Sequence, residues 1–160
     1  MFSNLRIPFS SKYVANKSEI SITTKIQKSM VNIIDNLEQS YCVIQIGEKV
    51  TEQDTQNYLA RFTHLINHQE RIGFAFQYLG GKPRKSKAGE KMEGEWLRVH
   101  KKELEKYCLG IAMVTSPSIE SLLKRIILKG AGKRLFGCNC ELFYSLDQAE
   151  EWFKTRSQSR

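Results

Sequence analysis

The stretch Ile72-Gly-Phe-Ala-Phe-Gln-Tyr78 decides the fold of this chain. It is apolar on both faces apart from Gln77, which is typical of a central strand covered on both sides. A second short apolar run, Leu109-Gly-Ile-Ala-Met-Val-Thr115, has the same character, and residues 90–107 between them have the spacing of an amphipathic helix. A strand, a helix and a strand in succession predict two parallel neighbours joined by a right-handed crossover.

The helix expected over residues 90–107 turns Trp96, Val99 and Leu104 toward the core, with Tyr107 at the margin of that face. Its acidic residues are interpreted as ordinary surface charges offset by neighbouring lysines. They are Glu90, Glu93, Glu95, Glu103 and Glu105.

Toward the N-terminus, the β-prone runs Val31-Asn-Ile-Ile34 and Tyr41-Cys-Val-Ile-Gln-Ile46 predict a hairpin with a longer loop. Thr51 stands three residues before Asp54, a weak variant of the capping box that satisfies free amides at a helix start. Apolar residues then recur at helical spacing to about Gln69, so a helix is expected there.

Toward the C-terminus, Ser116 followed by Pro117 is a good helix start, because serine caps and proline fits the first turn. Gly130 and Gly132 are expected to end that helix. A last strand over 140–144 follows. Ser145 with Gln148 predicts a capping box for a final short helix.

The predicted order is ββαβαβαβα, an α/β fold with a mixed, mostly parallel sheet of about five strands and four helices. Residues 1–30 show little periodicity and are expected to form an arm that is flexible or docked. The domain itself is expected over 31–156, followed by a tail at 157–160.

Composition limits the classes of protein to which the chain can belong. Of its 160 residues, 41% are hydrophobic and 26% charged, which indicates a globular chain. No apolar run approaches the roughly 20 residues that span a bilayer. The four cysteines, with no secretory signal ahead of them, predict reduced thiols in the cytoplasm. A net charge of +8 favours anionic partners.

Four stretches resemble the STAS domains of the SpoIIAA-like branch, which are related in shape to CRAL-TRIO lipid-transfer domains. The resemblance runs from about Val31 to Lys154, and its motifs are mainly packing signatures. The stretches are the hairpin ending in Gly47 with Thr51 opening the helix, Glu95-Trp-Leu-Arg-Val-His100, Cys108-Leu-Gly-Ile-Ala-Met-Val-Thr115, and the closing strand with Leu146-Asp-Gln-Ala-Glu-Glu-Trp152.

The resemblance implies a regulatory domain without catalytic activity. In signalling STAS domains a partner kinase phosphorylates a serine at the start of the helix after the central strand, in an Asp-Ser-Ser-Gly-like setting. The corresponding place here is the loop expected over 79–89, which lacks the tandem acid and serines. Ser86 is its only hydroxyl, so a phosphorylation site in this loop would have to be Ser86.

The same loop is the first candidate for a binding site. It places five cations within ten residues, after a central strand and before a helix start, where open α/β sheets bind ligands and helix amides attract anions. The cations are Lys82, Arg84, Lys85, Lys87 and Lys91. The alternative interpretation is a solvated loop.

Other chemistries find no support in the sequence. The segment Lys129-Gly-Ala-Gly-Lys-Arg134 follows a helix, the wrong order for a phosphate-binding loop, and is interpreted as a helix end with a basic surface. Cys138 and Cys140 have no partner pair for zinc, and His64 and His68 lack the accompanying glutamate of a metalloprotease helix. No nucleophile, base and orienting group occur together. We expect no metal, no cofactor and no catalytic residues.

Three functions therefore remain open. The first is a non-enzymatic interaction domain that binds a partner protein through the basic loop and the following helix. The second is binding of a lipid-like or other small amphiphilic ligand between sheet and helices. The third is electrostatic binding of nucleic acid, for which Phe76 and Tyr78 are the strand aromatics nearest to a stacking surface. The sequence also leaves the oligomeric state open.

Overall fold

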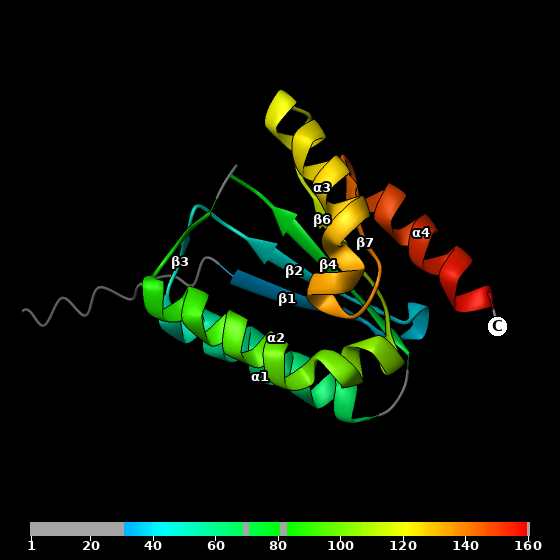
Figure 1. Cartoon of the computed structure of the whole chain (residues 1–160), viewed down its shortest axis with the longest axis horizontal. Coiled ribbons are helices and arrows are strands. Elements are labelled where there is room, and N and C mark those ends of the chain that lie inside the picture. The colour runs from blue at the N-terminus through cyan, green and yellow to red at the C-terminus, as the bar shows by residue number, and fades with distance from the viewer. Residues whose placement is uncertain (1–30, 69–70, 81–82, 160) are drawn as a thin grey trace, which may run out of the picture.

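The computed structural model describes residues 31–68, 71–80 and 83–159, so the expected N-terminal arm lies outside the described residues. A mixed sheet with the strand order β1-β2-β4-β6-β7 forms its centre (Figure 1). The first pair is antiparallel and all later pairs are parallel, as predicted. The strands are β1 Val31–Asn36, β2 Tyr41–Ile46, β4 Ile72–Tyr78, β6 Cys108–Val114 and β7 Cys140–Phe143.

The helices form unequal layers on the two faces of this sheet (Figure 1). From β2 to β7 every step of the chain moves the same way across the sheet, and right-handed crossovers then put the connecting helices on one face. These are α1 Glu52–Asn67, α2 Lys87–Tyr107 and α3 Ile119–Phe136. The last helix, α4 Leu146–Gln158, packs on the opposite face. It ends at Gln158 and therefore includes two residues of the expected tail.

A second, two-stranded sheet lies where α1 and α2 begin. In it β3 Lys49–Val50 pairs parallel with β5 Arg84–Lys85, and the Arg84 amide donates to the Glu48 carbonyl at 2.7 Å. Thr51 then caps α1 with both halves of a capping box, because its hydroxyl accepts from the Asp54 amide and its own amide donates to the Asp54 carboxylate. The weak capping signal in the sequence is confirmed.

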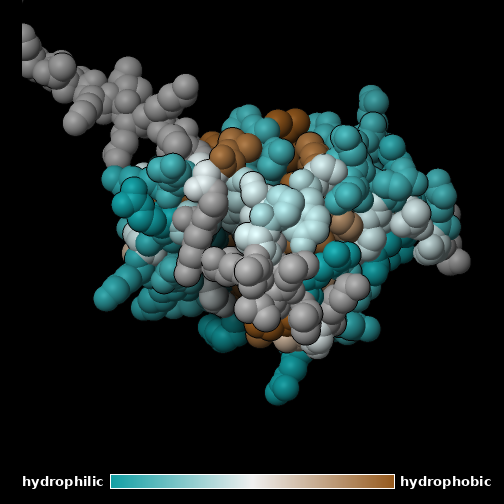
Figure 2. Space-filling view, turned by 90° about the horizontal axis from the view of Figure 1, so that it is seen from above, coloured by the Kyte–Doolittle hydropathy of each residue, from teal (hydrophilic) through white to brown (hydrophobic). Residues whose placement is uncertain are grey.

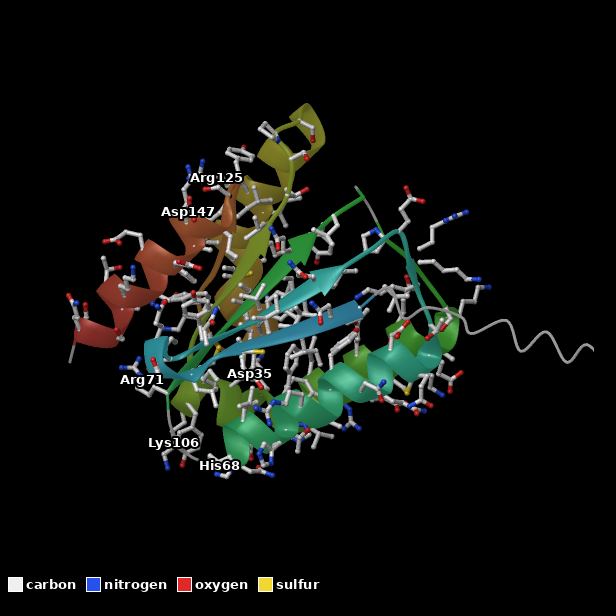
Figure 3. The ribbon with its side chains drawn as sticks, turned by 180° about the vertical axis from the view of Figure 1, so that it is seen from behind. Asp35, His68, Arg71, Lys106, Arg125 and Asp147 are labelled. Atoms are coloured by element: carbon white, nitrogen blue, oxygen red, sulfur yellow. The ribbon has the colours of Figure 1, made fainter. Side chains whose placement is uncertain are left out.

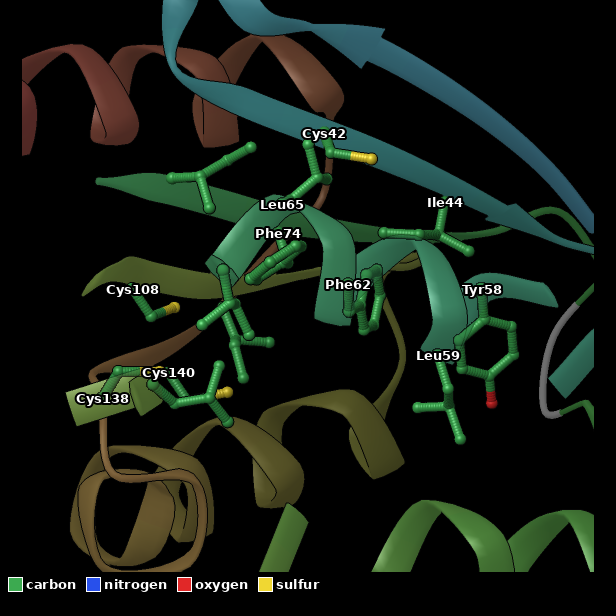
Figure 4. Packing of buried hydrophobic residues seen from close by; sticks show 14 of the residues in the cluster. Cys42, Ile44, Tyr58, Leu59, Phe62, Leu65, Phe74, Cys108, Cys138 and Cys140 are labelled. Carbon is green, nitrogen blue, oxygen red and sulfur yellow. The ribbon is translucent and has the colours of Figure 1, made fainter. Parts of the chain in front are cut away.

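The alternation of the strands divides the core into two clusters. One lies between the sheet and α1–α3, and Figure 4 shows Tyr58, Leu59 and Phe62 of α1 among its members. The other lies beneath α4, where Phe153 stacks on Tyr41 with ring centroids 5.5 Å apart.

The helices differ from expectation in several details. The helix α3 continues through Gly130 and Gly132 to Phe136, and the turn comes at Gly137, whose φ of +76° is a left-handed conformation that glycine adopts without strain. Gly132 is inside the helix because it packs on β7: a Cβ there would lie 2.6 Å from the Cβ of Cys140. The segment Lys129–Arg134 is therefore helical, and its Lys133 and Arg134 lie in the last turn of α3.

The second difference concerns the cap of α4. Ser145 accepts from the Gln148 amide at 3.3 Å, but the Gln148 side chain accepts from the amide of Tyr144, one residue before the cap. The predicted capping box is thus only half formed. The third difference is Val99, which is 61% exposed, because α2 turns Met92, Trp96 and Leu97 to the core in its place.

The surface of the described residues carries isolated apolar side chains. On the face shown in Figure 2, hydrophobic residues form a few separate patches between hydrophilic ones. Within the described part of the chain, no helix combines the length and the apolar character needed to cross a membrane.

Candidate functional site

Four of the five predicted cations are described, and the structure turns one of them, Lys85, away from the surface. Lys82 lies outside the described residues, and the segment that follows is a strand, not a loop. Successive residues of a strand point to opposite sides, so Arg84 is exposed while the Lys85 side chain turns inward and keeps only 16% of its exposure. The basic loop is therefore divided into an outer and an inner part.

The helix α2 starts three residues earlier than predicted, with Ser86 as its cap. The Ser86 hydroxyl accepts from the Gly89 amide at 3.0 Å. Lys87 and Lys91 consequently lie on the first turns of α2, both exposed, and Lys91 faces Glu95 at 3.9 Å. Ser86 is itself exposed, and its modification stays a prediction.

A cavity of about 180 Å³ lies between the sheet and the α1–α2 layer, beneath the place where the basic loop was expected. Its walls come from β4, β5, β6, α1, α2 and the end of α3 and are almost wholly apolar. The lining residues are Tyr58, Leu59, Phe62, Phe74, Phe76, Tyr78, Lys85, Glu93, Trp96, Leu97, Leu104, Ile111, Met113 and Phe136.

Aromatic rings dominate one wall of this cavity. Phe62 lies at their centre, with its ring centroid 4.4 Å from that of Phe74, 5.7 Å from Phe76 and 5.8 Å from Trp96. Burial raises the pKa of Tyr78 to about 12, so this lining residue stays neutral. Because Phe76 and Tyr78 face inward, neither provides the outer stacking surface that the nucleic-acid alternative needs.

The polar groups of the cavity are concentrated in one triad, formed by Lys85 of β5, Glu93 of α2 and Tyr58 of α1. The Lys85 Nζ lies 2.5 Å from the Glu93 Oε1, and the Tyr58 hydroxyl donates to the same oxygen. The Lys85 and Glu93 side chains are 16% and 23% exposed, so they stand between the apolar interior and solvent.

Partial burial moves the pKa values of the pair toward each other. It raises the pKa of Glu93 from 4.5 to about 7. It lowers the pKa of Lys85, an effect that the Glu90 carboxylate partly offsets. Both shifts have the same cause, because a charge loses hydration when it leaves water. The two shifts narrow the difference between the pKa values of Glu93 and Lys85.

The helix that carries Glu93 is fixed to α1 on both sides of it. At the start of α2, Gly89 allows close approach, since a Cβ there would lie 2.9 Å from the Thr55 hydroxyl oxygen. One turn after Glu93, the Trp96 indole donates to the Thr63 hydroxyl at 2.8 Å. These two contacts hold the carboxylate in place over the cavity.

The interpretation of Glu93 as an ordinary surface charge is wrong. It lies three residues before Trp96 and four before Leu97, so helical spacing places it on the apolar face. A carboxylate on that face was the available signal. Tyr58 gave no such signal, because a tyrosine fits an apolar helix face whether or not its hydroxyl has a role.

The histidine pair lies at the other end of the helix layer. The Nε2 atoms of His64 and His68 are 3.0 Å apart and share a hydrogen bond. Figure 3 shows His68, Arg71 and Lys106 at that end, where α1 and α2 finish and where positive charge is favourable to the helix dipoles. Within residues 31–68, 71–80 and 83–159, no three His, Cys, Asp or Glu side chains form a group suited to a metal ion.

Comparison with known proteins tests the fold. No family model and no curated protein matches the chain. A solved structure from Shewanella loihica PV-4, an uncharacterized protein of the DUF3478 family with a SpoIIAA-like fold, superposes with a TM-score of 0.52 at 12% sequence identity. The match covers 77% of this chain and 91% of the other. Together with the strand order and the placement of the helices, this likeness shows that the chain has a SpoIIAA-like α/β fold.

Proposed function

We propose that this domain is a non-enzymatic binding module for a small amphiphilic molecule that occupies the cavity between the sheet and α1–α2. The observation that carries the proposal is the combination of an aromatic interior with one polar triad at its margin, Lys85, Glu93 and Tyr58. Ligand sites are typically apolar pockets with a few polar groups that fix the orientation of the ligand.

The volume limits the size of the ligand. An apolar cavity of about 150 Å³ in another protein stays dry and binds benzene. The present cavity, at about 180 Å³, holds one ring with a short polar substituent. A lipid with long acyl chains exceeds this volume. The proposed ligand class is therefore narrowed from lipid-like molecules to single-ring amphiphiles.

The triad determines which head groups fit. Lys85 donates hydrogen bonds, and Glu93 accepts them or donates one when it is protonated. A hydroxyl or carbonyl substituent on the ring would find both kinds of partner. The apolar remainder would lie against the rings around Phe62.

A thermal-shift titration with benzyl alcohol tests the proposal. A ligand at 100 times its Kd stabilises the folded state by about 2.7 kcal/mol, so Tm should rise by several degrees. Leu97→Trp puts an indole into the cavity and should remove the shift. The same change at Leu135, which is 58% exposed on α3, is the matched control and should keep it.

A Tm that benzyl alcohol leaves unchanged, or that rises equally in Leu97→Trp, would contradict the proposal. Native mass spectrometry of the protein purified mildly from its own host gives independent evidence, because a bound small molecule would appear as added mass. A clean apo mass would count against a resident ligand.

The outer part of the basic loop supports a second candidate, capture of a partner protein. Arg84 and Lys87 are exposed, and Leu79 in the segment before them is 61% exposed. Exposed cations together with an exposed apolar side chain suit a partner with an acidic, partly apolar surface.

The division of the loop sharpens the test of this candidate. Arg84→Glu with Lys87→Glu should abolish capture of the partner and leave the Tm unchanged. Lys85→Met alone should leave capture intact, because that side chain points inward. Loss of capture only in Lys85→Met would place the contact elsewhere.

A further inference from the structure

Lys85 is the one amine among the described residues that line the cavity. Its Nζ lies within the triad, 2.5 Å from the Glu93 carboxylate and 5.9 Å from the centre of the Tyr58 ring. A molecule that places its polar end in the triad would therefore present that end to a nitrogen nucleophile with an acid beside it. Non-covalent binding of an amphiphile does not need an amine and an acid side by side in this way.

We propose that Lys85 captures an aromatic aldehyde as a protonated imine. Glu93 is the acid–base group that transfers the protons, and the aldehyde's ring lies in the cavity. This inference rests on the proposed function and specifies the ligand class as a single-ring aldehyde. It adds a reversible covalent bond and does not make the domain a catalyst of turnover.

The steps balance without a further reactant. A proton first passes from the Lys85 ammonium to the Glu93 carboxylate, which leaves a neutral amine. The nitrogen lone pair forms a bond to the carbonyl carbon, the C=O π pair moves to oxygen, and Glu93 returns its proton to that oxygen. Glu93 then takes a proton from nitrogen and gives it to the hydroxyl, which leaves as water while the lone pair forms C=N. The net change is R–CHO plus Lys–NH₃⁺ giving R–CH=NH⁺–Lys plus H₂O.

The product suits the surroundings of Lys85. A protonated imine keeps the positive charge of the ammonium, so the ion pair with Glu93 is retained, and its remaining N–H can still donate to the Oε1 atom. The ring moves from water into an aromatic cavity, which adds apolar burial to the covalent bond. An interior that excludes water also slows hydrolysis of the imine.

Burial lowers the pKa of Lys85 and raises that of Glu93 to about 7. Relative to an exposed lysine, more of the amine is then neutral at pH 7, and only the neutral amine attacks a carbonyl. The same shifts give Glu93 a pKa close to the working pH, which is the best range for a group that both gives and takes a proton.

Reductive trapping of the full chain tests the inference. The protein is incubated with benzaldehyde at pH 7, reduced with cyanoborohydride, and digested so that mass spectrometry can locate the benzyl-amine adducts. Lys85 should be labelled about tenfold or more faster than the exposed Lys91, because burial and proximity both favour its reaction. Labelling of Lys85 at the rate of Lys91 or below would overturn the inference.

Three variants and one competitor separate the causes. Glu93→Gln should slow labelling of Lys85 and leave that of Lys91 unchanged, and Leu97→Trp should do the same by filling the cavity, whereas Leu135→Trp should label like the wild type. Benzyl alcohol, which has no carbonyl group, should protect Lys85. If benzyl alcohol raises Tm while benzaldehyde fails to label Lys85 preferentially, the covalent inference fails and the proposed function stands. If neither happens, both fail.

Discussion

The Oε1 atom of Glu93 lies 2.5 Å from the Nζ of Lys85, at the place where an aromatic cavity meets solvent. The two residues come from different elements, α2 and β5, and the Tyr58 hydroxyl from α1 donates to the same oxygen. The contact thus joins three elements through side chains that are only partly accessible to water.

The Lys85–Glu93 pair should show energetic coupling in a double-mutant cycle. Above the Glu93 pKa of about 7, removing either partner leaves a half-buried charge without its counterpart, so Lys85→Met and Glu93→Met should each destabilise more than the double variant does. We expect a coupling energy of about 1 to 2 kcal/mol, between the values of exposed and buried pairs, from urea unfolding.

The exposed pair Lys91–Glu95, 3.9 Å apart on α2, is the matched control. Its coupling should be below about 0.5 kcal/mol. Equal coupling in the two cycles would mean that burial does not strengthen the triad.

The raised pKa of Glu93 predicts how stability depends on pH. Its pKa is about 7 in the folded state and 4.5 when free, so the folded state holds the proton more tightly. Stability from this group is full below pH 4.5 and is lost as pH rises toward 7. The Glu93→Gln variant lacks this loss.

Urea unfolding at a series of pH values would measure the effect as the difference between wild type and Glu93→Gln. The pKa change corresponds to about 3 kcal/mol at most, and solvent screening of this partly exposed group reduces it to about 1 kcal/mol. The other titratable groups that face this region are Lys85, Tyr58 and Glu90, and both proteins contain them. Parallel stability curves from pH 4.5 to 7 would contradict the assignment.

Two glycines should respond oppositely to alanine. A Cβ at Gly73 would lie 2.3 Å from the Phe153 ring, which is itself packed on Tyr41, so Gly73→Ala should cost about 3 kcal/mol. A Cβ at Gly94 in α2 meets nothing within 4 Å, so Gly94→Ala should stabilise by about 1 kcal/mol. Thermal unfolding of both variants checks the pair, and destabilisation by Gly94→Ala would show that α2 is more crowded than described.

The cysteine thiols should be unreactive in the folded protein. All four are buried, and burial raises the pKa of Cys42 and of Cys140 to about 12, so these two thiols form almost no thiolate at pH 8. Iodoacetamide should modify them only at the rate of unfolding, and completely in 8 M urea. Rapid modification of the native protein would indicate an opening of the core near Cys42 or Cys140.

Sequence reasoning predicted the fold well because the fold depends on strong periodicities. Local sequence patterns predict the apolar strands β4 and β6 and the capped start of α1, and tertiary contacts agree with those patterns. The errors come where a distant contact decides: Gly132 continues a helix because Cys140 packs against it, and Ser86 starts α2 early because β5 pairs with β3. Cys140 lies beyond the end of the helix and β3 lies far back in the chain, so the helical spacing within either segment does not reveal the contact.

The candidate site was harder to predict for a related reason. Consecutive cations in the sequence suggest one surface, but the strand formed by Arg84 and Lys85 sends their side chains apart. Glu93 becomes part of a site only when α2 is placed over β4. A cavity is a property of packing among several elements, and no single segment encodes it.

The short ladder of β3 and β5 has a mechanical consequence. It anchors the starts of α1 and α2 to each other, and the Thr55–Gly89 approach and the Trp96–Thr63 hydrogen bond continue the connection along their length. An occupant that widened the cavity would therefore rotate α1 and α2 together about their anchored ends. The largest displacement would fall at the far ends of the two helices, near His68 and Lys106. A change in amide exchange there on adding benzyl alcohol would report binding in the cavity beneath Lys85.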